Sequence, residues 1–328
     1  MALHKQSEIQ ALNAGIGIGH EDLKLKIRQL KKEKNAIILA HYYQEPAIQE
    51  VADYIGDSLG LSQEAANAGA EIIVFAGVQF MAETAKILNP GSKVLVPDPA
   101  AGCSLADSCD SRAFREFRER HPHHLAITYV NCSAEVKAYS DIVCTSSNAL
   151  KIIKAIPVET PIIFAPDKNL GRYLISQTGR EMLLWNGACE VHTAFSLSKL
   201  QSLMKANPDA ELVAHPESKT EILELANFIG STSAMIKYVA SSLANKFIIA
   251  TEAGILHQMA LEVPGKTLLP VPAVENNSCA CSECRYMKMN TLEKLYKCLD
   301  EEINEVHVDE AIRLKALKPL ERMIQMSN

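Results

Sequence analysis

Three cysteines could hold a metal centre, because Cys103, Cys189 and Cys284 each close one third of the chain. They are 86 and 95 residues apart, as expected for similar positions in three copies of one folding unit. If the copies surround a threefold axis, the three thiolates converge on one point. Thiolates are the usual ligands of iron–sulfur clusters, and three of them leave one coordination position to spare. The spacing therefore predicts a cluster site with an open position.

The other cysteines have simpler explanations. The chain contains nine cysteines and shows no export signal, so structural disulfides are not expected. Cys132, Cys144 and Cys298 lie within apolar strand or helix patterns and are predicted to be small buried hydrophobic residues. Cys109 is expected on a helix face without a functional role.

A C-x-C-x-x-C motif contains Cys279, Cys281 and Cys284. By itself the motif could hold zinc, contribute to an iron–sulfur cluster or include a redox pair. Zinc bound by local ligands alone would need a fourth partner, and none lies close by in the sequence. A disulfide between Cys281 and Cys284 would displace a cluster, so a regulatory disulfide is kept as an alternative.

Polar side chains follow the first strand of each third. The apolar runs 37–40, 127–130 and 212–214 lead into His41, Asn131 and His215, which are 90 and 84 residues apart. In parallel sheets, ligands bind outside the carboxyl ends of the strands. That rule selects hydrogen-bonding candidates for carboxylates and phosphate, namely His41, Tyr43, Asn131, Ser146, Ser147, His215, Glu217, Ser231 and Thr232. For Ser147 and Ser233, a helix N-cap is the favoured interpretation.

Strands and helices alternate along the chain, a pattern typical of parallel sheets flanked by helices. The second strands of the three thirds are predicted at 72–77, 141–147 and 227–233. Ile48, Val51, Ala52 and Ile55 are predicted to share one helix face. The sequence thus predicts an α/β fold of three similar repeats, at residues 1–104, 105–190 and 191–287. Two helices within 288–328 are expected to pack back on the body.

The totals limit the class of protein. The 328 residues are 48% hydrophobic, and the formal net charge of −6 argues against nucleic acid as a partner. The polar N-terminus lacks an apolar signal region. The longest apolar stretch, 72–82, is shorter than the roughly 20 residues of a transmembrane helix. We therefore expect a soluble, cytoplasmic protein without membrane contacts.

Many separate motifs resemble the quinolinate synthase family along nearly the whole chain. In order, they are AHYYQE (40–45), IGDSL (55–59), VFAGVQFMAETAKILNP (74–90), YVNCSAEVKAYSD (129–141), TSSNA (145–149), APDKNLG (165–171), CEVH (189–192), HPE (215–217), STSAMIK (231–237) and C-x-x-M-K-M-N-T-L (284–292). The resemblance implies three parallel-sheet α/β/α domains related by pseudo-threefold symmetry, with the active site at their junction. It also implies one [4Fe–4S] cluster held by Cys103, Cys189 and Cys284.

The resemblance also implies a reaction and roles for residues. The family condenses iminoaspartate with dihydroxyacetone phosphate to quinolinate, phosphate and water in NAD biosynthesis, with the cluster as Lewis acid for dehydration. Glu217 is then expected as general base and His215 as a hydrogen-bond donor, while Tyr43 and Tyr129 protonate or position the condensing groups. Further substrate contacts are expected from His41, Ser58, Asn131, Ser146, His192, Ser231 and Thr232. Functional coupling to L-aspartate oxidase, which supplies iminoaspartate, is expected as well.

Two other classes of function compete with this interpretation. An iron–sulfur hydro-lyase of aconitase type would use the same open iron on a small hydroxy acid and would release no phosphate. A cluster-bearing sensor or carrier would have no turnover. The sensor hypothesis gives no reason for His41, Asn131 and His215 to recur after equivalent strands.

Overall fold

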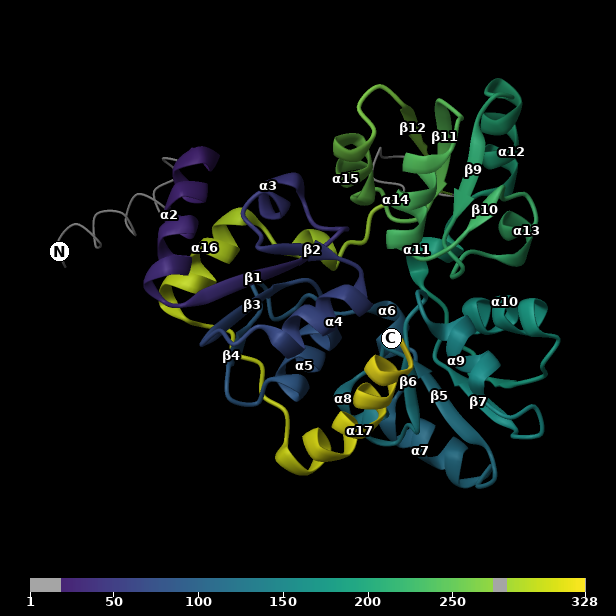
Figure 1. Cartoon of the computed structure of the whole chain (residues 1–328), viewed down its shortest axis with the longest axis horizontal. Helices are drawn as coiled ribbons and strands as arrows, with labels where there is room; N and C mark the ends of the chain where they lie inside the picture. The colour runs from purple at the N-terminus through teal and green to yellow at the C-terminus, as the bar shows by residue number, and fades with distance from the viewer. Residues whose placement is uncertain (1–18, 274–281, 328) are drawn as a thin grey trace.

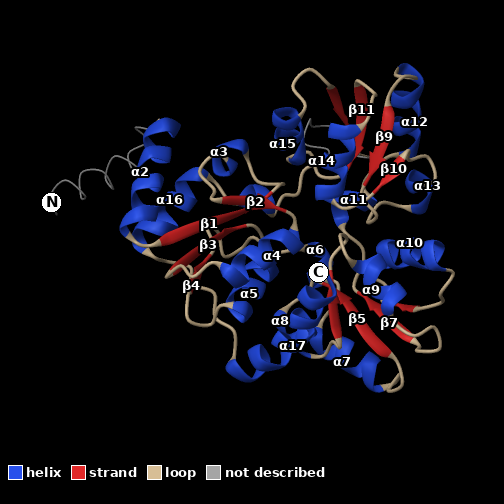
Figure 2. Cartoon of the chain, viewed as in Figure 1, coloured by secondary structure: helices blue, strands red, loops and turns tan. Residues whose placement is uncertain are grey.

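The computed structural model of the chain describes residues 19–273 and 282–327. It contains three four-stranded sheets, and every ladder between their strands is parallel (Figure 1). In each sheet the first and third strands in chain order are central, flanked by the second and the fourth. Helices separate successive strands (Figure 2). The prediction of three similar parallel α/β units is confirmed.

The first sheet is buried on both faces, which explains why its central strands read as continuous apolar runs. Ile38 and Ala40 pack into one core cluster, whereas Leu39 between them packs into another. The strands are β1 (Ala36–His41), β2 (Tyr54–Gly56), β3 (Ile72–Ala76) and β4 (Lys93–Leu95). The helices of this part are α2 (His20–Glu33), α3 (Pro46–Gln49), α4 (Ser58–Asn67) and α5 (Gln79–Leu88).

The second and third sheets repeat this arrangement. The second sheet and its helices comprise α6 (Ser104–Asp107), α7 (Ser111–Glu119), β5 (Leu125–Tyr129), α8 (Ala134–Ala138), β6 (Ile142–Cys144), α9 (Ala149–Ala155), β7 (Ile162–Ala165), α10 (Lys168–Thr178) and β8 (Leu183–Leu184). The third comprises α11 (Glu190–Thr193), α12 (Leu197–Ala206), β9 (Glu211–Ala214), α13 (Thr220–Leu223), β10 (Phe228–Ile229), α14 (Thr232–Ser241), β11 (Lys246–Ala250), α15 (Ile255–Glu262) and β12 (Thr267–Pro270). A 3₁₀ helix, η1 (Met287–Met289), follows.

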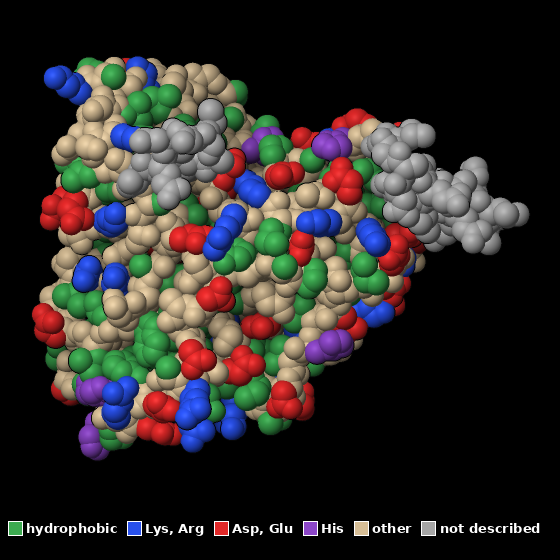
Figure 3. Space-filling model, turned by 180° about the vertical axis from the view of Figure 1, so that it is seen from behind, with side chains coloured by type: hydrophobic (Ala, Val, Ile, Leu, Met, Phe, Trp, Pro, Cys, Tyr) green, Lys and Arg blue, Asp and Glu red, His purple; other side chains and the backbone are tan. Residues whose placement is uncertain are grey.

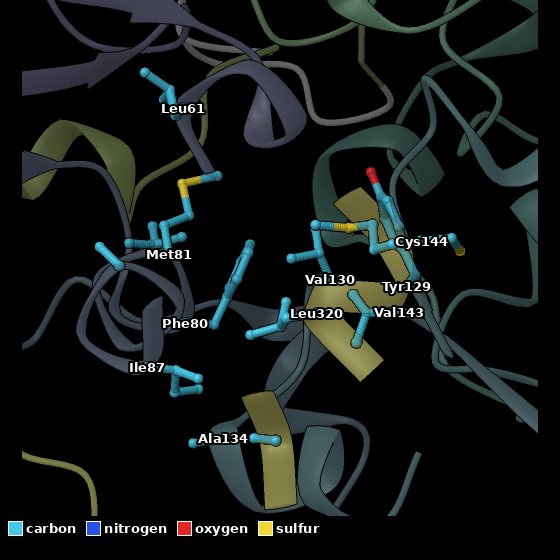
Figure 4. Packing of buried hydrophobic residues seen from close by; sticks show 14 of the residues in the cluster. Leu61, Phe80, Met81, Ile87, Tyr129, Val130, Ala134, Val143, Cys144 and Leu320 are labelled. Carbon is cyan, nitrogen blue, oxygen red and sulfur yellow. The ribbon is translucent and has the colours of Figure 1, made fainter. Parts of the chain in front are cut away.

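Two C-terminal helices pack against the earlier parts of the chain. Helix α16 (Leu292–Glu301) lies beside α2 and buries Leu295 in the same core cluster as Ile27. Helix α17 (Glu310–Ser327) contacts α5, α8 and β6. Figure 4 shows Leu320 of α17 among Phe80, Val130 and Val143. This helix therefore joins the core of the first sheet to that of the second.

One strand was missed by the sequence analysis. The run 72–77, predicted as a second strand, is β3 and therefore the third strand of its sheet, equivalent to β7 and β11. The true second strand is β2, which pairs Leu39 with Tyr54 and places Ile55 in a strand rather than on a helix face. Strand β2 is only three residues long and follows α3 closely. It is therefore too short to show a periodic pattern of apolar residues.

The surface carries charges of both signs. Figure 3 shows Lys and Arg side chains interspersed with Asp and Glu on the face seen from behind, in keeping with the small net charge. Several of these charges pair across elements, for example Lys93 with Glu302 at 2.7 Å. Within the two described ranges, no helix is both long and apolar enough to cross a membrane.

Candidate active site

A cavity of about 710 Å³, its open mouth included, lies where residues of all three sheets meet. Polar side chains at the carboxyl ends of parallel strands form much of its wall, as expected for α/β sheets. All the predicted catalytic and substrate-binding residues except Ser231 line it, together with the three predicted ligand cysteines. These residues are His41, Tyr43, Ser58, Cys103, Tyr129, Asn131, Ser146, Cys189, His192, His215, Glu217, Thr232 and Cys284.

The three cysteines each precede a short helical segment. Cys103 precedes α6, Cys189 precedes α11, and Cys284 lies three residues before η1. Burial raises the pKa of all three thiols, to about 12 for Cys103, although nearby backbone amides partly oppose the effect. Because metal binding requires thiolates, a bound metal must supply the stabilisation that burial removes.

The donor set fits an iron–sulfur cluster. Among the described residues, Cys103, Cys189 and Cys284 are free thiols, and one comes from each third of the chain. Apolar Met81 and Met287 line the same cavity, and apolar neighbours limit access of water to a cluster. Together the cysteines offer three thiol ligands, and the described part of the cavity wall contains no fourth cysteine. Three thiolates on a four-iron cluster leave one iron available to substrate.

The remaining cysteines lie outside the proposed ligand set. Cys279 and Cys281 lie outside the described residues, so the alternative of a regulatory disulfide stays a prediction. Cys132, Cys144 and Cys298 are buried among apolar side chains, as predicted. Cys109 is buried as well, beside Phe114 rather than on an exposed face.

Glu217 lies close to three other side chains of the cavity wall. Its carboxylate accepts a hydrogen bond from the Tyr129 hydroxyl at 2.6 Å and lies 3.2 Å from His192 Nδ1. The ring of His215 is 3.7 Å away. Burial alone would raise the pKa of Glu217, but His192, His215 and Tyr129 outweigh it and hold the pKa below its usual value. Glu217 is therefore an ionised carboxylate in a site with only 3% exposure.

Two histidines of the cavity are neutral. Burial lowers the pKa of His41 to about 4 and that of His215 to about 3. The backbone N–H of Tyr43 donates to His41 Nδ1 at 3.2 Å, so the proton of His41 resides on Nε2. His215 Nδ1 similarly faces the backbone N–H of Glu217, at 3.5 Å, and His215 Nε2 lies 3.1 Å from the Ser146 hydroxyl. Both rings can thus donate a hydrogen bond from Nε2.

The phenol of Tyr43 reaches across to the third unit. Its hydroxyl lies 2.6 Å from Thr251 Oγ1, and the same Thr251 oxygen lies 3.0 Å from His192 Nε2. Burial, and next the charge of Glu217, raise the pKa of Tyr43 well above its usual value. The same two causes act on Tyr129. Both phenols are therefore protonated and can act as donors.

The hydroxyl residues at helix starts differ in part from the predictions. Ser231, predicted to bind substrate, instead caps α14 by accepting the N–H of Ala234 at 3.4 Å. The predicted cap Ser233 lies inside α14. Ser147, also predicted as a cap, donates its hydroxyl to Asp57 at 2.6 Å. The N-cap of α14 is Ser231, two residues before the predicted cap, and its hydroxyl takes the free amide. The N-cap of α9 is Asn148, one residue after Ser147, and its side chain makes no capping hydrogen bond.

The described part of the cavity wall contains no lysine or arginine, so an anionic ligand would be held by neutral donors. Helices α4 and α14 begin at Ser58 and Thr232, and both residues line the cavity. Helix N-termini offer free N–H groups and a positive dipole end to phosphate or carboxylate. The buried Asn131 amide oxygen, also in the wall, has no hydrogen-bond partner among the described residues.

Sequence analysis missed several residues of the site. Glu252 is fully buried, accepts the backbone N–H of Cys284 at 3.1 Å and pairs with Lys288 at 3.4 Å. Lys288 also donates to the Tyr43 carbonyl at 2.9 Å, which ties the loop after β1 to the third unit. Thr251 and Glu252 follow β11 directly, so the rule of residues after strands would have found them.

The fold and the cavity define an α/β enzyme with three repeated units, whose acid–base residues line one cavity together with three free thiols. Comparison with known proteins agrees. A family model described as "Quinolinate synthetase A protein" matches residues 25–325. Proteins named quinolinate synthase from Synechococcus sp. and Cyanothece sp. are 58% identical over 306 residues and 59% identical over 307 residues. These alignments cover 93% and 94% of this chain and 95% of each relative. The chain belongs to the quinolinate synthase family.

Proposed function

We propose that this enzyme condenses iminoaspartate with dihydroxyacetone phosphate and forms quinolinate, one phosphate and two waters. The atoms of these substrates and products balance without net oxidation or reduction. One observation carries the proposal: Cys103, Cys189 and Cys284, one from each third of the chain, line the same cavity as Glu217 and Tyr129. The family membership supports the same reaction.

The cofactor in this proposal is a [4Fe–4S] cluster held by Cys103, Cys189 and Cys284. When bound, it would supply a Lewis-acid iron that makes a substrate hydroxyl a better leaving group in dehydration. A second group of possible metal donors, formed by Cys189, His192 and Glu217, lies within 4.8 Å. Because His192 and Glu217 already interact with each other and with hydroxyl groups, we assign only the cysteine to the cluster.

Glu217 is proposed as the general base that removes a proton from substrate carbon. Its lowered pKa keeps it ionised at neutral pH, and its low exposure excludes competing water. Tyr43 and Tyr129 are protonated phenols that can donate to the carbonyl or imine during condensation. His215 holds a neutral ring whose Nε2–H can donate to a substrate oxygen.

Substrate anions are proposed to bind without a cationic side chain. The N-terminal turns of α4 and α14, with Ser58 and Thr232, supply amide and hydroxyl donors for phosphate or carboxylate. Further donors are provided by His41, Asn131, Ser146 and His192. We assign Ser231 to capping α14 and no longer to substrate.

Several broader features complete the proposal. The enzyme would act in the cytoplasm in NAD biosynthesis, with functional coupling to an L-aspartate oxidase that supplies iminoaspartate. The domains are proposed at residues 1–104, 105–190 and 191–287, with 288–328 packed on the body. The strand order supports these limits, since each of the three domains contains the four strands of one sheet.

The test is an anaerobic purification followed by an assay with oxaloacetate, ammonia and dihydroxyacetone phosphate. We expect quinolinate and phosphate in equal amounts. An aconitase-type hydro-lyase would instead convert a single hydroxy acid and release no phosphate. A cluster-bearing sensor would bind these compounds without turnover. Absence of quinolinate from a protein that carries its full cluster would overturn the proposal.

A further inference from the structure

The three proposed ligand cysteines are held by the same backbone contacts in all three units. The carbonyl of each cysteine accepts the N–H of the residue four positions later, at 2.9 Å for Cys103, 3.0 Å for Cys189 and 3.1 Å for Cys284. The carbonyl two residues before each cysteine accepts the N–H of the residue three positions after the third strand of the unit. At 2.8, 2.9 and 2.9 Å, these bonds run from Gln79 to Ala101, from Lys168 to Gly187 and from Ala253 to Ser282. The three cysteines therefore occupy equivalent positions.

The residue just before each of these N–H donors differs among the units. It is Val78 in the first, Asp167 in the second and Glu252 in the third, and all three are buried. Val78 shows that the position can be apolar, whereas a buried carboxylate is costly unless it is hydrogen-bonded. Asp167 has a local explanation, because it caps α10 by accepting the N–H groups of Asn169 and Leu170 at 2.8 Å each. Glu252 is left without such an explanation.

Glu252 does not cap a helix, because α15 has Gly254 as its N-cap and no side-chain capping bond. Its Oε1 accepts the backbone N–H of Cys284 at 3.1 Å and lies 3.4 Å from Lys288 Nζ. Its Oε2 accepts the N–H of Gly254 at 2.7 Å. Lys288 is itself fixed, since its ammonium group donates to the Tyr43 carbonyl at 2.9 Å. The Cys284 amide is therefore anchored to a carboxylate that Gly254 and Lys288 hold in place.

We propose that Glu252 is a positioning residue that fixes Cys284 as the third ligand of the cluster. The inference rests on the proposed function, which gives the Cys284 sulfur a cluster to bind. A hydrogen bond to the backbone N–H of a ligand residue sets the direction of its Cα–Cβ bond, and so the place of its sulfur. Groups that orient metal ligands in this way typically contribute about 10–100-fold to metal affinity.

The test uses pairs of substitutions, because a single one would leave a buried charge without its partner. Glu252→Gln with Lys288→Met, the glutamine double variant, removes both charges and retains a carbonyl oxygen that can accept the Cys284 N–H. Glu252→Val with Lys288→Met, the valine double variant, also removes both charges but offers no acceptor, like Val78 in the first unit. The two double variants thus differ only in the acceptor at position 252.

Iron release to a chelator from the anaerobically loaded protein is the main measurement. We expect release from the valine double variant to be at least about 10-fold faster than from the wild type, and release from the glutamine double variant to stay within about 2-fold of it. Urea unfolding of the metal-free proteins checks that both double variants are folded. Arg285→Met is the matched control, because Arg285 follows Cys284 directly but its ion pair with Glu190, at 3.2 Å, is largely exposed. Its iron release should match the wild type.

A second measurement reports on the bond without any iron. In metal-free protein labelled with ¹⁵N-cysteine, the Cys284 amide should exchange its hydrogen at least about 10-fold faster in the valine double variant than in the glutamine one. If the valine double variant does not fold, Glu252→Leu with Lys288→Met makes the same comparison with a longer apolar side chain. Equal iron release from the two double variants would overturn the inference. A wild-type protein that holds no four-iron cluster would instead overturn the proposed function.

Discussion

The hydroxyl of Tyr129 donates a hydrogen bond to the carboxylate of Glu217 at 2.6 Å, between residues 88 positions apart in the sequence. Tyr129 ends β5 of the second sheet, and Glu217 lies after β9 of the third. The bond therefore forms only when the two units are docked. It places the proposed base and a phenolic donor in one hydrogen-bonded group.

Tyr129→Phe tests what this bond does for the base. Loss of the donor should raise the pKa of Glu217, because the hydroxyl is one of the groups that hold it low. We expect kcat to fall about 100-fold, with its acidic limb shifted to higher pH. A pH profile of kcat measures both effects. The prediction is wrong if the acidic limb does not move.

Glu217→Gln tests the base itself. The amide keeps the size of the side chain and its contact with Tyr129 but cannot accept a proton from carbon. Turnover should fall by at least about 100-fold, while cluster absorbance and the thermal midpoint of unfolding stay close to those of the wild type. Near-normal turnover in this variant would remove Glu217 from the mechanism.

The cluster ligands are tested by replacing cysteines one at a time. Cys103→Ala, Cys189→Ala and Cys284→Ala should each lose the brown absorbance of the anaerobically purified protein and its activity. Cys144→Ala is the control, because Cys144 is buried in strand β6 and is not one of the residues that line the cavity. It should lose some stability and keep its colour. If the Cys284→Ala protein kept its brown colour and its activity, Cys284 would be excluded as a cluster ligand.

Gly187, two residues before Cys189, lies against the backbone of Pro166. A Cβ at this position would lie 2.6 Å from the Pro166 carbonyl oxygen, and backbone cannot yield as a flexible side chain does. Gly187→Ala should destabilise the fold by about 1–3 kcal/mol, measured by urea unfolding, and should weaken iron binding. Gly91→Ala is the control, since its Cβ would meet nothing within 4 Å. Equal stability of the two variants would contradict the expected clash.

The neutral histidines predict a loss of stability in acid. Their pKa values are lowered on folding, so the unfolded chain binds more protons as the pH falls below about 6.5. Each histidine then removes up to roughly 1.4 kcal/mol of stability per pH unit, down to its folded pKa. His41→Asn should therefore lose less stability between pH 7 and pH 5 than the wild type, as measured by urea unfolding. His123→Asn is the control, because His123 is exposed and its replacement should leave the pH dependence of stability unchanged. An unchanged pH dependence in His41→Asn would contradict the assignment.

The sequence predicted those parts of the molecule that repeat. His41, Asn131 and His215 follow equivalent strands, and this recurrence was visible at spacings of 90 and 84 residues. Strand β2 was not visible, because it is only three residues long and is held by backbone pairing with β1, without a side-chain pattern of its own. Contacts such as Tyr43 with Thr251, 208 positions apart, depend on how the units dock. No local pattern in the sequence encodes them.

The central claim is that three cysteines, one from each repeated unit, hold one four-iron cluster and leave one iron free for substrate. Mössbauer spectra of the ⁵⁷Fe-loaded enzyme test it most directly, recorded with and without quinolinate. The account predicts that one iron of the four changes its signal when quinolinate binds, while the other three keep theirs. Four irons that all stay unchanged with quinolinate bound would contradict it.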